Sequence, residues 1–284
     1  MSTPSEPCSP LTVESGDGAA VRFCAHGGHV LGWTPVGGTE RLWLSRDTEC
    51  GDGVAIRGGV PVIWPQFSDR GPGPRHGVAR DRAWQVMGAG SDDRGDAVAR
   101  LRLTGDAGTT PIPHAFALHL EVRASGSTLD IELTARNDGT DDLTMTAALH
   151  TYLRVASTTG TRVTGLEGLL ARPNDGQPPW PVDGPIEVVG PLDVAVEGVA
   201  DGEAGAVVVD DGGSGAVTLT ARGFDSRVVW NPGPGRAPGD VHAGGEAEFV
   251  CVEPALLTPL TLGAGRSWRG VQTLSVGSGS DAAG

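Results

Sequence analysis

Two side chains in this sequence have the types and settings that general acid–base chemistry requires. His150 ends a segment of alternating apolar and polar residues, and Tyr152, the one tyrosine of the chain, follows two positions later. Glu253 ends another apolar segment, just before a proline, on the same face as Phe249 and Cys251. Partial burial would raise the pKa of its carboxyl group toward that of a general base. Each also has a structural alternative, a hydrogen-bonded histidine and a carboxylate paired with an arginine.

Arginine side chains concentrate in two segments that could bind an anion. Arg57 precedes two glycines, so the backbone can approach a ligand closely while a planar guanidinium grips it with two hydrogen bonds. Residues 69–82 contain four arginines and one histidine within fourteen positions. Local positive charge in an acidic protein attracts a small anionic substrate to one place, although ion pairs with the two aspartates of the segment are an alternative. The candidate binding residues here are Arg75, His76 and Arg80.

The cysteines and histidines give little indication of a metal site. Cys24 and His26 have the spacing of residues in a strand, and two glycines interrupt the chain before His29. The four cysteines include no Cys-x-x-Cys pair, and no secretory signal precedes them, so we expect reduced thiols. We therefore expect neither a metal nor any other cofactor.

Composition excludes several classes of function. The 284 residues carry a formal charge of −14, which repels nucleic-acid backbones. All 21 basic residues are arginines, which excludes a Schiff-base lysine and a phosphate-loop lysine. Apolar runs are too short to span a membrane. We expect a cytoplasmic monomer that acts on a small molecule and has no nucleic-acid or membrane partner.

Alternation of period two dominates the chain and predicts an all-β fold, a large antiparallel β-sandwich. The 45 glycines and 21 prolines favour short strands joined by turns, and no twelve-residue segment keeps a helical stripe. We expect a single domain, 1–284, with flexible tails at about 1–10 and 276–284, and mostly loops over 171–215. The expected strands are 20–25, 29–35, 41–44, 98–103, 116–123, 129–134, 143–149, 217–221, 227–231, 248–253 and 268–276.

Five motifs of the chain resemble those of the D-hexose-6-phosphate mutarotases (glucose-6-phosphate 1-epimerases) of the aldose 1-epimerase superfamily. They occur in the same order along the chain as in that family. With two smaller matches they extend from about residue 42 to 255. Any one would be weak, but the ordered set is specific. The motifs are Arg57-Gly58-Gly59-Val60-Pro61, His76-Gly77-Val78-Ala79-Arg80, His150-Thr151-Tyr152-Leu153-Arg154, Val229-Trp230-Asn231-Pro232 and Cys251-Val252-Glu253-Pro254-Ala255.

The resemblance implies a galactose-mutarotase-type β-supersandwich that interconverts the α and β anomers of a hexose 6-phosphate. It implies catalytic roles for His150 and Glu253. In the expected mechanism Glu253 accepts the anomeric hydroxyl proton, while protonated His150 donates to the ring oxygen from the other side of the sugar. The implied substrate contacts are Arg57, Arg80, Asp240 and His76.

The chain departs from the family pattern at two places. Arg75 stands where the family usually has glutamine, which adds charge beside the expected phosphate grip. The family's ligand-binding aspartate has no clear counterpart after 165–168, and Asp175 is a candidate substitute. Two other functions stay open: an aldose 1-epimerase for unphosphorylated sugars, and a β-sandwich that binds sugars or sugar phosphates without catalysis.

Overall fold

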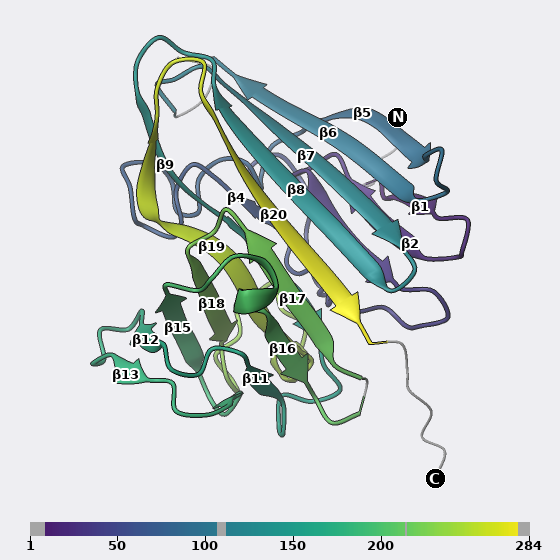
Figure 1. Ribbon diagram of the computed structural model, residues 1–284, viewed down its shortest axis with the longest axis vertical. Helices are drawn as coiled ribbons and strands as arrows, with labels where there is room; N and C mark the ends of the chain where they lie inside the picture. Colours follow the sequence, from purple (N-terminus) through teal and green to yellow (C-terminus); the bar gives the residue numbers. More distant parts are fainter. Residues whose placement is uncertain (1–8, 107–111, 214, 278–284) are drawn as a thin grey trace.

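The computed structural model describes residues 9–106, 112–213 and 215–277, which form three sheets (Figure 1). Every ladder between named strands is antiparallel, so the predicted all-β class is confirmed. The smallest sheet contains three strands, in the order β1 (Leu11–Glu14), β2 (Ala20–Cys24) and β3 (His29–Thr34).

The two larger sheets carry most of the chain. The nine-stranded sheet has the order β14 (Ile186–Glu187), β11 (Arg162–Thr164), β16 (Val207–Asp210), β17 (Val217–Arg222), β20 (Ser267–Val276), β8 (Thr128–Asn137), β7 (Phe116–Ser125), β6 (Ala97–Gly105) and β5 (Gln85–Ser91). The eight-stranded sheet has the order β13 (Trp180–Pro181), β12 (Leu170–Pro173), β15 (Leu192–Glu197), β18 (Ser226–Asn231), β19 (Phe249–Leu262), β9 (Leu143–Leu149) and β4 (Val62–Ile63), and β10 (Tyr152–Arg154) pairs with β19.

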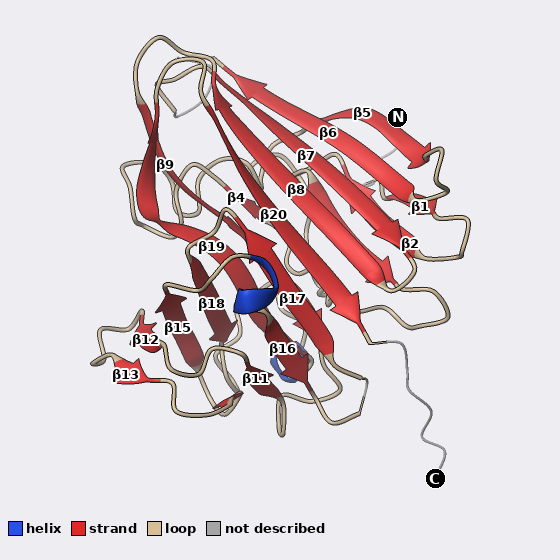
Figure 2. Ribbon diagram, viewed as in Figure 1, coloured by secondary structure: helices blue, strands red, loops and turns tan. Residues whose placement is uncertain are grey.

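One large apolar core joins these sheets. Alternate residues of β7 and β8, such as Leu120 and Leu133, face side chains of the eight-stranded sheet, such as Val229 and Val252, in the same buried cluster. Figure 1 shows β5 to β8 and β20 side by side as a long diagonal sheet, with β9, β19, β18 and β15 beside it. Figure 2 shows how little of the chain is helical; the helices are the short η1 (Gly202–Gly205) and η2 (Gly245–Ala247).

Strand β19 has both faces covered, and its alternation places the catalytic candidate. Val250 and Val252 point into the main core. Phe249 and Cys251 point to the opposite face, where they pack in a second apolar cluster with Tyr152. Glu253, two residues after Cys251, continues this second face, as the sequence pattern predicts.

Several expectations about the elements need correction. Residues 41–44 form isolated bridges from Leu42 and Leu44 rather than a strand. Cys50 is disulfide-bonded, whereas the sequence predicted reduced thiols, because the spacing of cysteines does not determine which sulfur atoms meet in the fold. The expected tails lie almost wholly outside the described residues. Among those described, no helix is long and apolar enough to cross a membrane.

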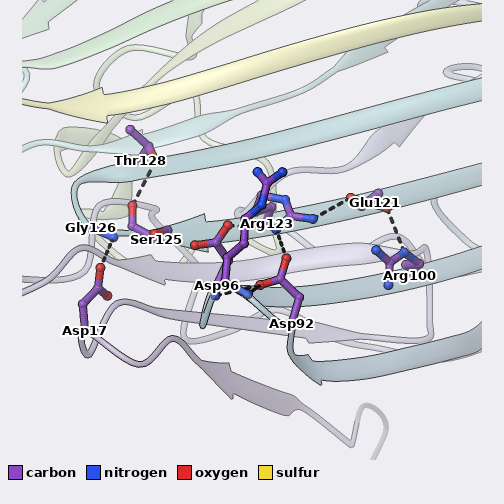
Figure 3. A network of polar contacts seen from close by, with 10 residues as sticks. Asp17, Asp92, Asp96, Arg100, Glu121, Arg123, Ser125, Gly126 and Thr128 are labelled. Carbon is purple, nitrogen blue, oxygen red and sulfur yellow. Dashed lines mark hydrogen bonds and ion pairs between the residues drawn. The ribbon is translucent and has the colours of Figure 1, made fainter.

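Arg123 in β7 ties the hairpin turn between β5 and β6 to the rest of the large sheet (Figure 3). Its guanidinium bonds Asp92 and lies 2.9 Å from Asp96 and 3.3 Å from Glu121. One half-buried cation therefore offsets three carboxylates that repel one another.

Replacement of Arg123 with alanine is expected to lower the free energy of unfolding at neutral pH. The bond from Arg123 lowers the pKa of Asp92 from 3.8 to about 2. A depressed carboxyl pKa stabilises the fold above the unfolded-state pKa, and this contribution disappears as the pH falls through about 2. In urea unfolding, the deficit of Arg123→Ala should be largest near pH 7 and shrink toward pH 2.

Arg100 provides the control, because its exposed ion pair with Glu121 joins β6 to β7 without reaching the turn between β5 and β6. Arg100→Ala should have a small effect on unfolding. A deficit for Arg123→Ala that does not change with pH contradicts the assignment.

Candidate active site

A cavity of about 800 Å³ opens on the face of the eight-stranded sheet that turns away from the main core. Strand residues form its floor and the segments 67–80 and 173–176 form walls. Six of the seven predicted site residues line it: Arg57, Arg75, His76, Arg80, His150 and Glu253. The seventh, Asp240, contacts one of them.

The sheet register brings His150 and Glu253 together. Ala148 pairs with Ala255 across β9 and β19, and continuing this antiparallel register by two residues puts His150 opposite Glu253. The Nε2 atom of His150 lies 3.4 Å from Oε1 of Glu253. The imidazole ring also stacks on Tyr152, with centroids 4.8 Å apart.

Each member of this pair keeps one polar atom that the fold does not use. Both side chains are buried, and within the described chain Nδ1 of His150 and Oε2 of Glu253 have no hydrogen-bond partner. A buried polar atom without a partner costs about 1–3 kcal/mol. A polar ligand in the cavity could satisfy such atoms.

Burial favours the neutral form of both groups. It raises the pKa of Glu253 well above its ordinary value, and the negative charge of Asp193 adds to the increase. It also lowers the pKa of His150 well below its ordinary value, with smaller contributions from His76, Arg57 and Arg80. Burial therefore opposes a charge on either member of the pair.

The geometry differs from the expected arrangement of the pair. An acid and a base on opposite sides of a sugar cannot be 3.4 Å apart, because no ring fits between them. The difference follows from the register, since neighbouring strands place the two side chains on one face of the sheet.

Arg57 is held in the cavity wall by two side chains. Its Nε donates to Oδ1 of Asp240 at 3.0 Å, and its Nη1 donates to the hydroxyl oxygen of Tyr152 at 2.9 Å. Gly58 follows with φ of +111°, and a Cβ there would lie 2.4 Å from the carbonyl oxygen of Trp43. The Arg-Gly-Gly sequence thus reflects close packing beside Arg57, as the sequence suggested, although the partner is backbone and not a ligand.

A tight bend presents His76 to the cavity. Gly77 has φ of +73°, and a Cβ there would lie 2.0 Å from the carbonyl oxygen of Trp64. The Nδ1 atom of His76 accepts a bond from the backbone N–H of Ser68 at 3.3 Å, so the neutral ring carries its proton on Nε2. Burial, followed by the charge of Arg80, lowers the pKa of His76 to about 3. His76 is therefore a neutral hydrogen-bond donor.

Arg75 occupies the solvent side of the same segment. Its Nη1 lies 2.5 Å from Oδ2 of Asp69, and both side chains are exposed. Its backbone carbonyl accepts a bond from Nη2 of Arg80 at 3.3 Å. Arg75 thus lines the rim of the cavity, whereas Arg57 and Arg80 lie deeper.

Asn174, Asp193 and Trp230 line the cavity but were not among the predicted site residues. Trp230 belongs to a motif that the sequence analysis quoted, but Asn174 and Asp193 come from the irregular region that was expected to be mostly loops. Asp175, the candidate substitute, lines an adjoining cavity instead. The adjoining cavity of about 600 Å³ shares Pro173, Asp193 and Trp230 with the first.

Two histidines of the segment that follows Cys24 contact backbone carbonyls. His26 and His29 contact the backbone carbonyls of Val54 and Gly58 at 2.6 and 2.7 Å. His150, Cys251 and Glu253 have ligand atoms within 4.8 Å of one another. Burial raises the pKa of the thiol and of the carboxyl, which opposes the deprotonation that metal binding requires.

Solved structures place this fold among the mutarotase-like proteins. A protein of Salmonella typhimurium, provisionally named a mutarotase, matches with a TM-score of 0.81 and 28% identity. The match covers 97% of this chain and 95% of the other. A Synechocystis protein matches with a TM-score of 0.78 and 20% identity, over 97% and 99% of the two chains, and supports the fold alone. The protein is therefore a β-sandwich of the mutarotase-like class.

Sequence comparison defines the family. The family model described as aldose 1-epimerase matches residues 10–275, so the chain belongs to the aldose 1-epimerase family. A protein of Salmonella typhimurium, provisionally named glucose-6-phosphate 1-epimerase, is 33% identical over 83% of this chain and 79% of its own length. An Escherichia coli protein with the same provisional name is 34% identical over 82% and 78%.

Gly77→Ala is expected to destabilise the fold by about 2–5 kcal/mol, because a left-handed conformation and a backbone clash act together. Gly53 separates the two effects, since its φ of +76° is similar but no atom lies within 4 Å of a Cβ there. Gly53→Ala should cost about 1–2 kcal/mol. Urea unfolding measures both variants, and equal costs would show that the contact with Trp64 does not shape the bend.

Proposed function

We propose that the protein interconverts the α and β anomers of an aldohexose 6-phosphate, with glucose 6-phosphate as the first substrate to test. The observation that carries the proposal is the contact between His150 and Glu253 in a cavity with Arg57 and Arg80. Two provisionally named glucose-6-phosphate 1-epimerases cover most of the chain, which supports the same substrate class.

Ring opening requires a proton on the ring oxygen and removal of the proton from the anomeric hydroxyl. Both oxygens are bonded to C1, so an acid and a base that lie side by side can serve them from one edge of the sugar. Glu253 accepts the proton of the anomeric hydroxyl while His150 donates a proton to the ring oxygen, and the roles reverse when the ring closes on the other face of the aldehyde. Proton balance is maintained because one proton enters the substrate as another leaves.

The phosphate group has a role in both binding and proton transfer. Arg57 and Arg80 carry permanent positive charge, and together with His76 they oppose protonation of His150. A bound phosphate dianion would offset these cations and make it easier for His150 to accept a proton. It would also hold C1 at the acid–base pair.

His150→Ala and Glu253→Gln are each expected to lower kcat by about 10²- to 10⁴-fold, because each removes one of the two proton-transfer groups. Polarimetry of freshly dissolved α-glucose 6-phosphate, corrected for the solvent rate, measures the loss. Circular dichroism and thermal unfolding must show that both variants stay folded. Near-normal turnover in either folded variant defeats the catalytic assignment.

Arg57→Ala is expected to raise KM for glucose 6-phosphate by about 10- to 100-fold, because a charge-assisted hydrogen bond to phosphate is lost. The same substitution should raise KM for free glucose far less. Equal effects on the two sugars would show that Arg57 does not recognise phosphate. A wild-type enzyme that prefers free glucose would indicate an aldose 1-epimerase of unphosphorylated sugars.

We also propose that the protein acts in the cytoplasm as a monomer, without a cofactor or a nucleic-acid or membrane partner. Sugar phosphates are charged metabolites that do not cross a bilayer unaided, so an enzyme that uses them belongs in the compartment that makes them. Size-exclusion chromatography with light scattering tests the oligomeric state.

A further inference from the structure

Two separate segments hold Arg57, one by its backbone and one by its side chain. The backbone N–H of Ser45 donates to the carbonyl oxygen of Arg57 at 3.0 Å, and the N–H of Arg57 donates to Oγ1 of Thr48 at 2.7 Å. The guanidinium is held by Asp240, which belongs to the loop between β18 and β19. The orientation of the guanidinium therefore depends on how this loop is fixed relative to segment 45–48.

His242, two residues after Asp240, joins the loop to that segment. Its Nδ1 accepts a hydrogen bond from the backbone N–H of Arg46 at 3.1 Å. Its own backbone N–H donates to Oγ of Ser45 at 3.1 Å. The contacts of His242 thus close a frame in which the segment that fixes the backbone of Arg57 also fixes the loop that holds its side chain.

The other edge of the imidazole is fixed as well. Because Nδ1 accepts the N–H of Arg46, the ring proton is on Nε2, which donates to Oε2 of Glu248 at 3.2 Å. The same carboxylate oxygen accepts the Nε1–H of Trp43 at 3.1 Å, and the rings of Trp43 and His242 stack with centroids 5.5 Å apart. His242 is buried and both of its ring nitrogens have partners, so the loop cannot shift here without breaking these contacts.

Ser45, His242 and Glu248 have the residue types of a hydrolytic triad, but their arrangement opposes nucleophilic chemistry. Ser45 and His242 are buried and do not line the cavity. Oγ of Ser45 accepts the backbone N–H groups of His242 and Asp47. The ring nitrogen nearest to Oγ already accepts the N–H of Arg46, so its lone pair is not free to take the hydroxyl proton. The cluster therefore supports the cavity wall and is not a second active centre.

We propose that His242 is a positioning residue: it holds Asp240, and through Asp240 the guanidinium of Arg57, in the orientation that binds the phosphate group. The inference rests on the proposed function. Asp240 and Tyr152 each bond one N–H group of Arg57, which fixes the plane of the guanidinium. A guanidinium makes two parallel hydrogen bonds to phosphate only when this plane is directed at the anion. Without His242 the charge stays nearby, but the second hydrogen bond is lost.

The experiment measures KM and kcat of wild type, His242→Ala, Asp240→Ala and the double variant with glucose 6-phosphate and free glucose. His242→Ala should raise KM for glucose 6-phosphate by about 3- to 10-fold, which corresponds to one hydrogen bond, and change kcat less. KM for free glucose should rise far less. The double variant should have the same KM as Asp240→Ala, because His242 acts through Asp240.

Asn137→Ala controls for lost stability alone. Asn137 is buried and donates from Nδ2 to the carbonyl oxygens of Asp141 and Leu262, away from the residues that line the cavity. Asn137→Ala should lower stability in urea unfolding without changing KM for either sugar. His242→Gln, which can keep one of the two ring contacts, serves if His242→Ala does not fold. It should raise KM for glucose 6-phosphate by a smaller factor and again spare free glucose.

The outcomes separate the inference from the proposed function. Equal KM changes for the two sugars, or effects of His242→Ala and Asp240→Ala that multiply in the double variant, overturn the positioning role even if the enzyme is active. A rise in KM for Asn137→Ala as large as that for His242→Ala also overturns it, because lost stability would then explain both. If wild-type protein does not accelerate anomerisation of glucose 6-phosphate, the proposed function fails and the positioning role fails with it.

Discussion

The contact between an imidazole and a carboxyl group in a buried place is the interaction on which the site depends. Burial lowers the pKa of His150 and raises that of Glu253, so it favours the neutral form of each side chain. Such a pair can give one proton and take another with no net change in charge. Acid–base isomerisation needs this property and no more from its reacting side chains.

The rest of the structure explains why the pair can exist. His150 directly follows β9 and Glu253 lies in the paired strand β19, so the ladder between these strands positions both residues. The side chains on the opposite face of β19 belong to the main core. Tyr152 connects the pair to Arg57, because it stacks on His150 and accepts a hydrogen bond from Arg57. The sheet therefore positions His150 and Glu253, while the segments that cover it carry the arginines of the cavity.

Local pattern predicted much of this architecture, and long-range pairing accounts for most of the errors. Alternation located the strands around His150 and the side of β19 that carries Glu253, since period two is a local property. It did not predict that the two side chains touch, because that depends on the register between strands about a hundred residues apart. Asp193 was missed because β15 is a short strand between turns, and only its pairing with β18 places it in the cavity.

The two walls of the cavity differ in how much change they can tolerate. A methyl group at Gly58 or Gly77 would collide with backbone, so the cationic wall has little freedom to vary. At the opposite rim Asn174 and Asp193 are exposed, and a Cβ at Gly176 would meet no atom within 4 Å. Evolution could therefore redirect the enzyme toward another sugar by exchanging rim side chains, while the machinery for proton exchange stays as it is.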